Sequence, residues 1–575
     1  MALKPARELG DVLRERGVLT DDQLQLVRTY QSKQDHPAHR IILDLGLATE
    51  QETLEALAAV HALEFDPLTH LVVPKKLLKQ VPLKLILHYR FIPIELSDES
   101  LTVAYGDLPS SLELANLRLL LKRKIRYVLT TPSQIEAIIK AEFGLGAETV
   151  HKLRDSKQEL HDQQELVFDL SDETTGKSMD GTISELVDQI LEEALRLRTT
   201  DIHFEPYART IKLRYRIDGL LQTIPVPREL KPLYTAIVSR LKVMAELDIS
   251  DRRFPQDGRI SMKSNGENYD LRISVLPTKH GEALCLRILG RQSLFLAAEE
   301  LGMLPEQESL FHRLTRLAQG MVLISGPTGS GKTTTLYAAL TRAHDERRKV
   351  ITIEDPIEYQ IEGIAQMQTR EDIGLSFAKG LRSILRHDPD VVLVGEIRDR
   401  ETAEIAVRAA QTGHLVLSTL HSNDSLATIP RLLNMGVDAT VLAASLNCSI
   451  AQRLARKNCK ACRVQDDHAT PELRDEMKAC LKQESEGLHP QLGAGCLECQ
   501  ESGVRGRIAI YEFAAITEPI AEAISNRQSL IQLRATASEQ GWKPLRQIAF
   551  QRVADGTISL SELQRITWRL DFTQI

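Results

Sequence analysis

The stretch Gly326-Pro327-Thr328-Gly329-Ser330-Gly331-Lys332-Thr333 decides the fold of the second half of this chain. It follows a short apolar run, 321–324, which predicts a strand, and it opens an expected helix at 333–344. Glycines at this spacing let backbone N–H groups turn toward phosphate oxygens, and the start of the helix adds positive potential. We therefore predict that this loop, together with Thr334, binds the phosphates of ATP.

The residues after this loop alternate between expected strands and expected helices. Apolar runs predict strands at 349–354, Val391–Val394 and Leu415–Leu420, and amphipathic segments predict helices at 376–386 and 401–411. Short apolar strands separated by helices are typical of a parallel sheet that is covered by helices on both faces.

Four side chains are predicted to complete a magnesium-nucleotide site. Lys332 is expected to reach the β- and γ-phosphates, and the Thr333 hydroxyl is expected to bind Mg²⁺. Glu396 follows one expected strand and is predicted to hold Mg²⁺, whereas Glu358 follows another and is predicted to orient the attacking water. The alternative for each of these acids, and for the neighbouring pair at 354–355, is a solvated loop carboxylate.

Two histidines bracket the last of the expected strands. His414 precedes this strand and His421 follows it. One of them is expected to sense the phosphate of the bound nucleotide, and the alternative is a purely structural role.

Four of the seven cysteines form two CxxC pairs, Cys459 with Cys462 and Cys496 with Cys499. Four thiolates at such spacing suit Zn²⁺ in a closed, structural site. Coincidental pairs or a redox dithiol are the alternatives.

The composition narrows the classes of function. The chain has 575 residues and a net charge of −7, which does not favour a nucleic-acid partner. No apolar run approaches the roughly 18 residues that cross a bilayer, and the first residues lack the apolar core of a signal peptide. We therefore expect a cytoplasmic protein with no membrane span of its own.

The first half of the chain is predicted to contain several separate parts. An internal repeat relates residues 13–20 to residues 42–49. Each copy ends on a threonine that begins a helix-capping pair, Thr20 with Gln23 and Thr49 with Glu52. Residues 155–181 are rich in acidic side chains and poor in apolar ones. The expected domains are a helical docking module at 1–65, an α/β domain at 66–150, an acidic flexible linker at 151–181, a second α/β domain at 182–295, and an ATPase domain at 296–575. Within the ATPase domain we expect a zinc insert at about 455–505 and C-terminal helices at about 515–575.

Taken together, these motifs resemble those of the type II secretion and type IV pilus assembly ATPases, over nearly the whole chain. The resemblance implies a RecA-like P-loop ATPase core with a zinc-binding insert, preceded by a smaller α/β domain and by an N-terminal helical and α/β region. It also implies a homo-hexameric ring whose ATP cycle moves subunits against an inner-membrane platform protein. Apart from the phosphate loop and the cysteines, the matching stretches are 200–206, 214–219, 255–259, 354–358, 412–421, 452–454, 503–507 and 510–512.

The resemblance also assigns arginines to the nucleotide site. In that family, arginines of the second N-terminal domain reach the nucleotide, and the matching residues here are Arg272 and Arg287. A guanidinium group would neutralise the charge that develops on the γ-phosphate. A local ion pair is the alternative for each, and Arg382 and Arg398 are further candidates within the ATPase domain.

Residues 1–65 resemble the N-terminal module of that family, which binds cyclic di-GMP in some members through an Arg-Leu-Gly start in each repeat. The first repeat here reads Glu8-Leu9-Gly10, and the position that matches Gly10 in the second repeat is His39 or Arg40. An acid where a guanidinium should meet phosphate or guanine argues against binding. We therefore expect a module that docks another protein.

Two other classes of function are weighed against the motor. A nucleotide-regulated scaffold would hydrolyse little ATP, and the intact set of Lys332, Thr333, Glu358 and Glu396 argues against it. A RecA-like nucleic-acid translocase is disfavoured by the acidic net charge. Retraction motors resemble the core but lack the long N-terminal region and the cysteine insert, so assembly is favoured over retraction. The motifs do not distinguish a type IV pilus system from type II secretion.

Overall fold

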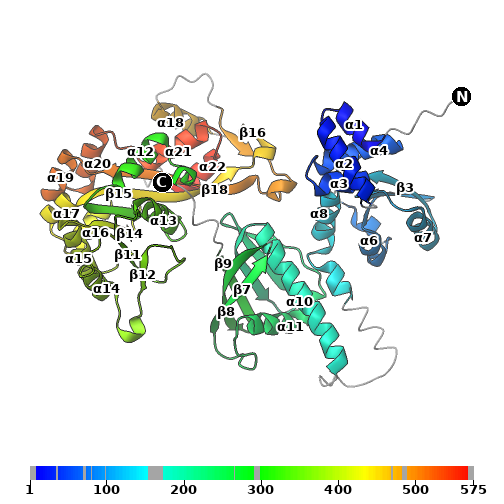
Figure 1. Ribbon diagram of the computed structural model, residues 1–575, viewed down its shortest axis with the longest axis horizontal. Coiled ribbons are helices and arrows are strands. Elements are labelled where there is room, and N and C mark those ends of the chain that lie inside the picture. The colour runs from blue at the N-terminus through cyan, green and yellow to red at the C-terminus, as the bar shows by residue number, and fades with distance from the viewer. Residues whose placement is uncertain are drawn as a thin grey trace. The chain divides into compact units, whose positions relative to one another are not determined.

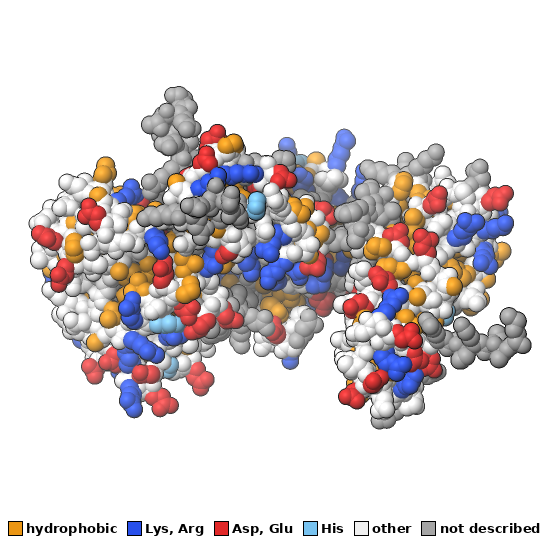
Figure 2. Space-filling model, turned by 90° about the horizontal axis from the view of Figure 1, so that it is seen from above, with side chains coloured by type: hydrophobic (Ala, Val, Ile, Leu, Met, Phe, Trp, Pro, Cys, Tyr) orange, Lys and Arg blue, Asp and Glu red, His pale blue; other side chains and the backbone are white. Residues whose placement is uncertain are grey.

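The computed structural model describes residues 8–33, 36–68, 73–78, 80–97, 99–152, 173–264, 266–289, 298–467, 470–481 and 489–567. The chain divides into two compact units, Met1–Leu289 and Gly290–Ile575, each with its own sheets and cores (Figure 1). On the face drawn in Figure 2, acidic and basic side chains are interspersed. Within the described ranges, no helix is long and apolar enough to cross a membrane.

Two of the four N-terminal helices, α2 and α4, begin where the capping pairs predict. Gln23 and Thr20 exchange hydrogen bonds ahead of α2, and Thr49 and Glu52 form the same reciprocal pair ahead of α4. Each pair satisfies N–H groups that would otherwise be free at a helix start. The four helices of this region are α1 (Leu9–Glu15), α2 (Asp21–Lys33), α3 (Ala38–Asp44) and α4 (Glu50–His61).

A three-stranded sheet follows these helices and shares a core with them. Leu13 of α1 and Ile42 of α3 lie in the same buried cluster as Phe91 and Val103 of the sheet. The helical region and the sheet therefore fold around one hydrophobic core. The elements are α5 (Lys75–Leu78), α6 (Leu83–Tyr89), β1 (Phe91–Leu96), β2 (Ser100–Tyr105), α7 (Ser111–Leu121), β3 (Lys124–Leu129) and α8 (Pro132–Phe143), with sheet order β1-β2-β3.

A six-stranded antiparallel sheet completes the first unit, with order β6-β5-β4-β9-β8-β7. Its strands are β4 (Thr199–Pro206), β5 (Ile211–Ile217), β6 (Leu220–Ile224), β7 (Gln256–Ser264), β8 (Glu267–Thr278) and β9 (Gly281–Leu289). Alternate residues of these strands enter a core with helices α10 (Glu173–Arg196) and α11 (Leu230–Met244), which cover one face. Residues 153–172 of the expected linker lie outside the described residues, and α10 begins at Glu173, before the expected end of that linker.

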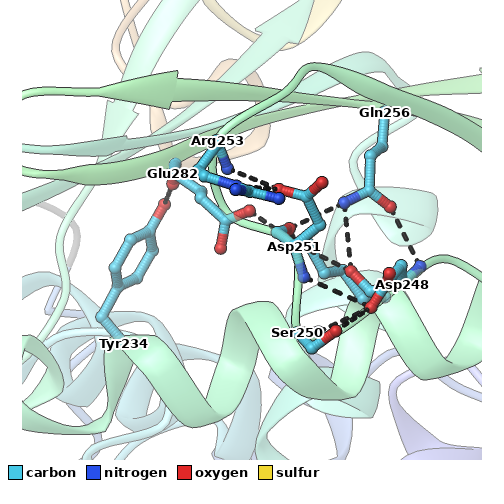
Figure 3. Close-up of polar contacts among 8 residues, drawn as sticks. Tyr234, Asp248, Ser250, Asp251, Arg253, Gln256 and Glu282 are labelled. Atoms are coloured by element: carbon cyan, nitrogen blue, oxygen red, sulfur yellow. Dashed lines mark hydrogen bonds and ion pairs between the residues drawn. The ribbon is translucent and has the colours of Figure 1, made fainter.

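Polar contacts hold the loop between α11 and β7, where Asp248, Asp251 and Gln256 lie together (Figure 3). Lys242 is fully buried, and its Nζ lies 2.6 Å from Glu282 Oε1 of β9. The same amine donates hydrogen bonds to the backbone carbonyls of Asp248 at 3.1 Å and Asp251 at 2.8 Å. The side-chain amide of Gln256 binds these two carbonyls as well, at 3.0 and 2.8 Å. Groups from three elements therefore hold this loop.

The second unit contains the predicted parallel sheet, extended to seven strands in the order β12-β11-β13-β14-β10-β15-β18. Met321 and Leu323 of β10 enter one buried cluster, whereas Val322 and Ile324 enter another, so helices cover both faces. All neighbouring strands are parallel except β15 and β18. The strands are β10 (Gly320–Ser325), β11 (Val350–Glu354), β12 (Ala365–Gln368), β13 (Val391–Val394), β14 (Leu415–Leu420), β15 (Leu446–Asn458) and β18 (Val504–Ala515).

The helices of this unit surround the sheet, and a small insert lies between β15 and β18. The helices are α12 (Pro305–Leu314), α13 (Lys332–Ala343), α14 (Phe377–Ile384), α15 (Arg400–Gln411), α16 (Thr428–Asn434), α17 (Ala439–Ser445), α19 (Glu518–Ser525), α20 (Leu530–Glu539), α21 (Leu545–Ala554) and α22 (Leu560–Thr567). The insert consists of the paired strands β16 (Arg463–Gln465) and β17 (Gln491–Gly493) and the helix α18 (Pro471–Leu481).

Candidate nucleotide site and metal cluster

The glycine-rich loop joins β10 to α13, as the sequence predicts. Gly326 and Gly331 have positive φ angles of 153° and 87°, and a Cβ atom on Gly326 would lie 2.6 Å from the carbonyl oxygen of Gln452. Side chains at these positions would therefore strain the loop. Lys332 Nζ donates to the carbonyls of Gly326 at 2.9 Å and Pro327 at 3.0 Å. Burial lowers the pKa of Lys332, and nearby Arg453 acts in the same direction.

This loop fits the phosphates of a nucleotide. Its residues lead into the N-terminus of α13, where Thr333 and Thr334 stand half-buried in the first turn. The hydroxyl of Ser330 is buried and has no hydrogen-bond partner within the described structure. Backbone N–H groups at a helix start, a lysine and unpaired hydroxyls are groups that bind phosphate oxygens and Mg²⁺.

The predicted acids lie at the edge of the sheet that carries this loop. Strands β11, β13, β14 and β10 are parallel neighbours, so their carboxyl ends meet at one edge. Glu396, two residues beyond β13, is paired with the guanidinium of Arg398, and His421 Nε2 lies 3.4 Å from its other oxygen. Arg398 also reaches Asp355 Oδ2 at 3.4 Å. Glu358 lies half-buried in the loop after β11.

Glu354 is not a solvated loop carboxylate. It is buried at the end of β11 and accepts hydrogen bonds from Tyr337 Oη at 2.6 Å, Thr352 Oγ1 at 2.6 Å and Gln366 Nε2 at 3.1 Å. Tyr337 comes from α13, the helix that follows the phosphate loop, and burial raises its pKa. The N–H of Tyr359 donates to the same hydroxyl at 3.5 Å. Tyr337 thus joins the phosphate-loop helix to the segment that carries Glu358.

Sequence reasoning missed Tyr337, because nothing in its spacing distinguishes it from a core residue of an amphipathic helix.

The two predicted histidines lie at different places in the structure. His421 lies beside Glu396, but His414 lies at the opposite end of β14, about 20 Å away along six residues of strand. His414 Nδ1 is 3.0 Å from the carbonyl of Ala409 instead. Arg382 is paired with Glu401 at 2.5 Å between α14 and α15.

The first unit presents a row of arginines on the sheet face opposite α10 and α11. Directly paired residues across five strands are Arg216, Asp201, Arg287, Arg272 and Arg259, in that order. Paired residues of neighbouring strands share a face, so these side chains form one line. Arg287 Nε donates to Asp201 Oδ1 at 3.0 Å, and Arg216 lies 3.6 Å from Asp201 Oδ2. The two arginines predicted from the resemblance are therefore neighbours, and Arg216 and Arg259 extend their row.

The four predicted metal ligands meet in one cluster at the base of the insert. All four sulfur atoms lie within 4.8 Å of one another, and the Sγ–Sγ distances are 3.8 Å for Cys459–Cys496, 3.8 Å for Cys462–Cys499 and 3.7 Å for Cys496–Cys499. Tetrahedral Zn–S bonds of about 2.3 Å place sulfurs about 3.8 Å apart. The cluster thus has the donor set and the spacing that Zn²⁺ requires.

A cavity of about 500 Å³ lies among the N-terminal helices, at the segment that carries Glu8 and at the matching segment of the second repeat. Its arginines are already paired. Arg28 contacts Glu8 at 3.2 Å, and Arg40 contacts Asp107 at 2.7 Å. Burial raises the pKa of Asp107, but hydrogen bonds from His39 and Arg40 outweigh burial and hold the pKa far below its usual range. The guanidinium groups of this cavity are therefore engaged by carboxylates.

The fold and the site define the class of this protein: it is a P-loop nucleotide-binding protein with a parallel α/β core. The family model described as "Type II/IV secretion system protein" matches residues 177–565, and a model of the MshEN domain matches residues 61–148. The chain belongs to the type II/IV secretion system protein family, as the sequence motifs predict.

Two relatives agree in sequence with this assignment, and one solved structure is also similar. The type IV pilus assembly ATPase PilB of Myxococcus xanthus is 36% identical over 560 residues, which cover 96% of this chain and 98% of that protein. The type II secretion system protein E of Pseudomonas aeruginosa is 43% identical over 390 residues, 68% of this chain and 76% of that protein. A crystal structure of the pilus retraction motor PilT with bound ADP is 26% identical, with a TM-score of 0.44, and covers 67% of this chain and 98% of that chain.

Proposed function

We propose that this chain is a Mg²⁺-dependent motor ATPase that powers the assembly of a type IV pilus or of a type II secretion pseudopilus. The observation that carries the proposal is the convergence of the Lys332 loop with Glu396 and the Glu358 segment at one edge of a parallel sheet. Membership in the secretion family, with pilus assembly and type II secretion ATPases among its relatives, supports the same function.

We assign one role in ATP hydrolysis to each functional residue at the carboxyl edge of the parallel sheet. Lys332 leaves the carbonyls of its own loop and binds the β- and γ-phosphates. Thr333 and Glu396 hold Mg²⁺, which supplies charge neutralisation on the phosphates when it is bound. Glu396 gives up its contact with Arg398 to do so, and Glu358 orients the attacking water. His421, beside Glu396, is placed to respond to the phosphate.

The arginine row bears on the oligomeric state that we propose for this ATPase. We infer a homo-hexamer in which Arg272 and Arg287 of one chain act on the nucleotide that a neighbouring chain holds. Residues 1–150 would dock the ring to an inner-membrane platform protein at the cytoplasmic face. Zn²⁺ on the four cysteines would fix the insert between β15 and β18, and its role would be structural because all four donors come from the protein.

The direct test measures ATP turnover and DNA binding of the purified full chain. A motor ATPase hydrolyses ATP in a Lys332-dependent way and binds DNA no better than a neutral control protein across a salt series. Absence of turnover with intact nucleotide binding would favour the scaffold. Tight binding of DNA that weakens steeply with salt would favour a translocase.

A further inference from the structure

The outward face of α7 is apolar although the helix belongs to a folded domain. Leu112, Leu119 and Leu120 are 71%, 77% and 56% exposed, while Leu117 on the inward face is fully buried. Leu112 and Leu119 are seven residues apart and therefore lie on one face, roughly 10 Å apart along the axis. Single exposed leucines are ordinary on protein surfaces, but three on two turns of one helix form a patch.

This leucine patch is bordered by positive charge. Residues 111–127 contain five basic side chains but only one acidic one, Glu113, and the Glu113 carboxylate caps α7 by accepting from the Ser110 N–H at 2.7 Å. Arg123 is half-buried and donates to the carbonyl of Ser97. The four other basic residues are exposed and form no ion pair with any described carboxylate: Arg118, Lys122, Lys124 and Arg126.

We propose that the outward face of α7 docks an amphipathic helix of a partner protein, one that carries apolar residues at i, i+3 or i+4 and i+7 and acidic residues along its flanks. The leucine spacing matches the anchors of a helix that packs against another helix. The basic border selects acidic flanks by charge complementarity. Because Leu117 fixes the other face of α7 in the domain core, this surface is formed before the partner arrives.

A protein helix fits this patch better than a lipid surface does. Helices that lie in a membrane interface usually insert aromatic side chains along a long apolar face. The segment Ser111–Leu121 contains no aromatic residue, and its exposed leucines cover only two turns. The inference deepens the proposed function, because it names the chemistry of the partner that holds the N-terminal region. It uses no residue of the nucleotide site, so each can fail without the other.

One test places a photo-activated cross-linking amino acid at position 112 or 119 of the full chain in its native host cells. The control position is 531, because Ile531 on α20 is 78% exposed and equally apolar. We expect adducts from positions 112 and 119 but not from 531, and we expect the cross-linked partner peptide to be an acidic amphipathic helix. Adducts only with lipid or with a second copy of this chain would overturn the proposal.

A second test uses a labelled synthetic helix with leucines at i, i+4, i+7 and i+11 and glutamates on both flanks, with its scrambled sequence as control. We expect the full chain to bind the designed helix, and Leu119→Ser to weaken binding about tenfold. Ile531→Ser should bind as the unaltered chain does, and unchanged circular dichroism should show that the variants fold. Equal binding of the scrambled peptide, or binding to phosphatidylglycerol vesicles that Leu119→Ser abolishes while peptide binding is absent, would reject a docked protein helix.

Discussion

The carboxyl edge of the seven-stranded sheet and the arginine face of the six-stranded sheet present their functional groups in opposite ways. At the first, side chains stand in loops at the ends of parallel strands, each within a few residues of a buried apolar run. At the second, arginines stand on the strands themselves and are aligned by antiparallel register across five strands. The loop residues of the carboxyl edge belong to contiguous sequence motifs. The arginines of the other sheet come from separate strands and are aligned only once that sheet has formed.

The two regions also differ in what their charges already contact. Lys332 and Glu396 are paired within their own edge, with loop carbonyls and with Arg398. The arginine row has one carboxylate, Asp201, among four guanidinium groups. The first region must exchange partners in order to bind a nucleotide, while the second lines up four guanidinium groups that could meet an anion. The comparison therefore predicts that the carboxyl edge of the seven-stranded sheet binds the nucleotide. The arginine face of the six-stranded sheet is predicted to supply positive charge to a bound nucleotide.

The largest effect is expected from Lys332→Ala, which removes the cation of the phosphate loop. ATP turnover should fall at least about a hundredfold, because the charge on the transferred phosphoryl group loses the neutralising contact that the loop supplies. Steady-state phosphate release by the purified chain measures this. Lys349→Ala, at an exposed lysine of the same unit, is the matched control and should hydrolyse ATP normally.

Glu358→Gln separates binding from chemistry at the same edge. The amide keeps the size of the side chain but cannot polarise water, so fluorescent-nucleotide affinity should stay within about twofold while turnover falls at least about tenfold. Normal turnover in Glu358→Gln would remove this residue from the catalytic role.

The next effect tests whether the arginines on the six-stranded sheet of one chain act on the nucleotide site of a neighbouring chain. Arg272→Ala/Arg287→Ala chains and Lys332→Ala chains should each be inactive alone, because each lacks one half of the proposed site. Mixed before assembly, they should regain a measurable fraction of hydrolysis at interfaces where an intact loop meets intact arginines. Arg209→Ala, at an exposed arginine in the turn between β4 and β5, is the control. Mixed rings that stay inactive would refute action between chains.

A smaller effect on hydrolysis is expected from the cysteine cluster, which lies outside both regions. The purified chain should contain one zinc per molecule, and Cys459→Ser should lose it and unfold several degrees earlier, because metal binding stabilises the folded insert. Elemental analysis and a thermal scan measure both. Cys480→Ser, outside the cluster, should keep its zinc. Zinc-free protein prepared without chelators would contradict the assignment.

The smallest effect on ATP turnover is expected from Tyr337→Phe. This variant tests whether the link from Tyr337 to Glu354 and to the Glu358 segment contributes to catalysis. Glu354 would lose one of its three donors, and the segment carrying Glu358 would lose its link to α13. One hydrogen bond of about 1 kcal/mol corresponds to a fall of about fivefold in kcat, with the KM for ATP nearly unchanged. A purely structural role would instead lower the melting temperature and leave kcat alone.

Local motifs explain why so much of the second unit was predictable. Strands Val391–Val394 and Leu415–Leu420 have the predicted bounds, because buried parallel strands are short apolar runs between helices. The edge strand β12 was missed since Ala365–Gln368 is partly exposed and carries no apolar run. The strands β15 and β18 were missed as well, because charged residues such as Arg456 and Arg507 interrupt their apolar pattern.

The functional residues divide in the same way. The phosphate loop and the CxxC pairs could be predicted because fixed spacing alone defines them. The burial of Glu354 could not, since it depends on Tyr337 and Gln366, which reach it from other elements. Likewise, His414 and His421 look equivalent in the sequence, and only their places at opposite ends of β14 distinguish them.

The buried pair of Lys242 and Glu282 constrains how this sequence can change over generations. Losing one partner leaves a buried charge without its counter-ion, at a cost of about 3–5 kcal/mol, a large share of a domain's stability. Replacing both with apolar residues of similar volume removes both charges at once, and the amide of Gln256 still binds the two loop carbonyls. Positions 242 and 282 are therefore expected to be substituted together or not at all, although they lie 40 positions apart in the chain.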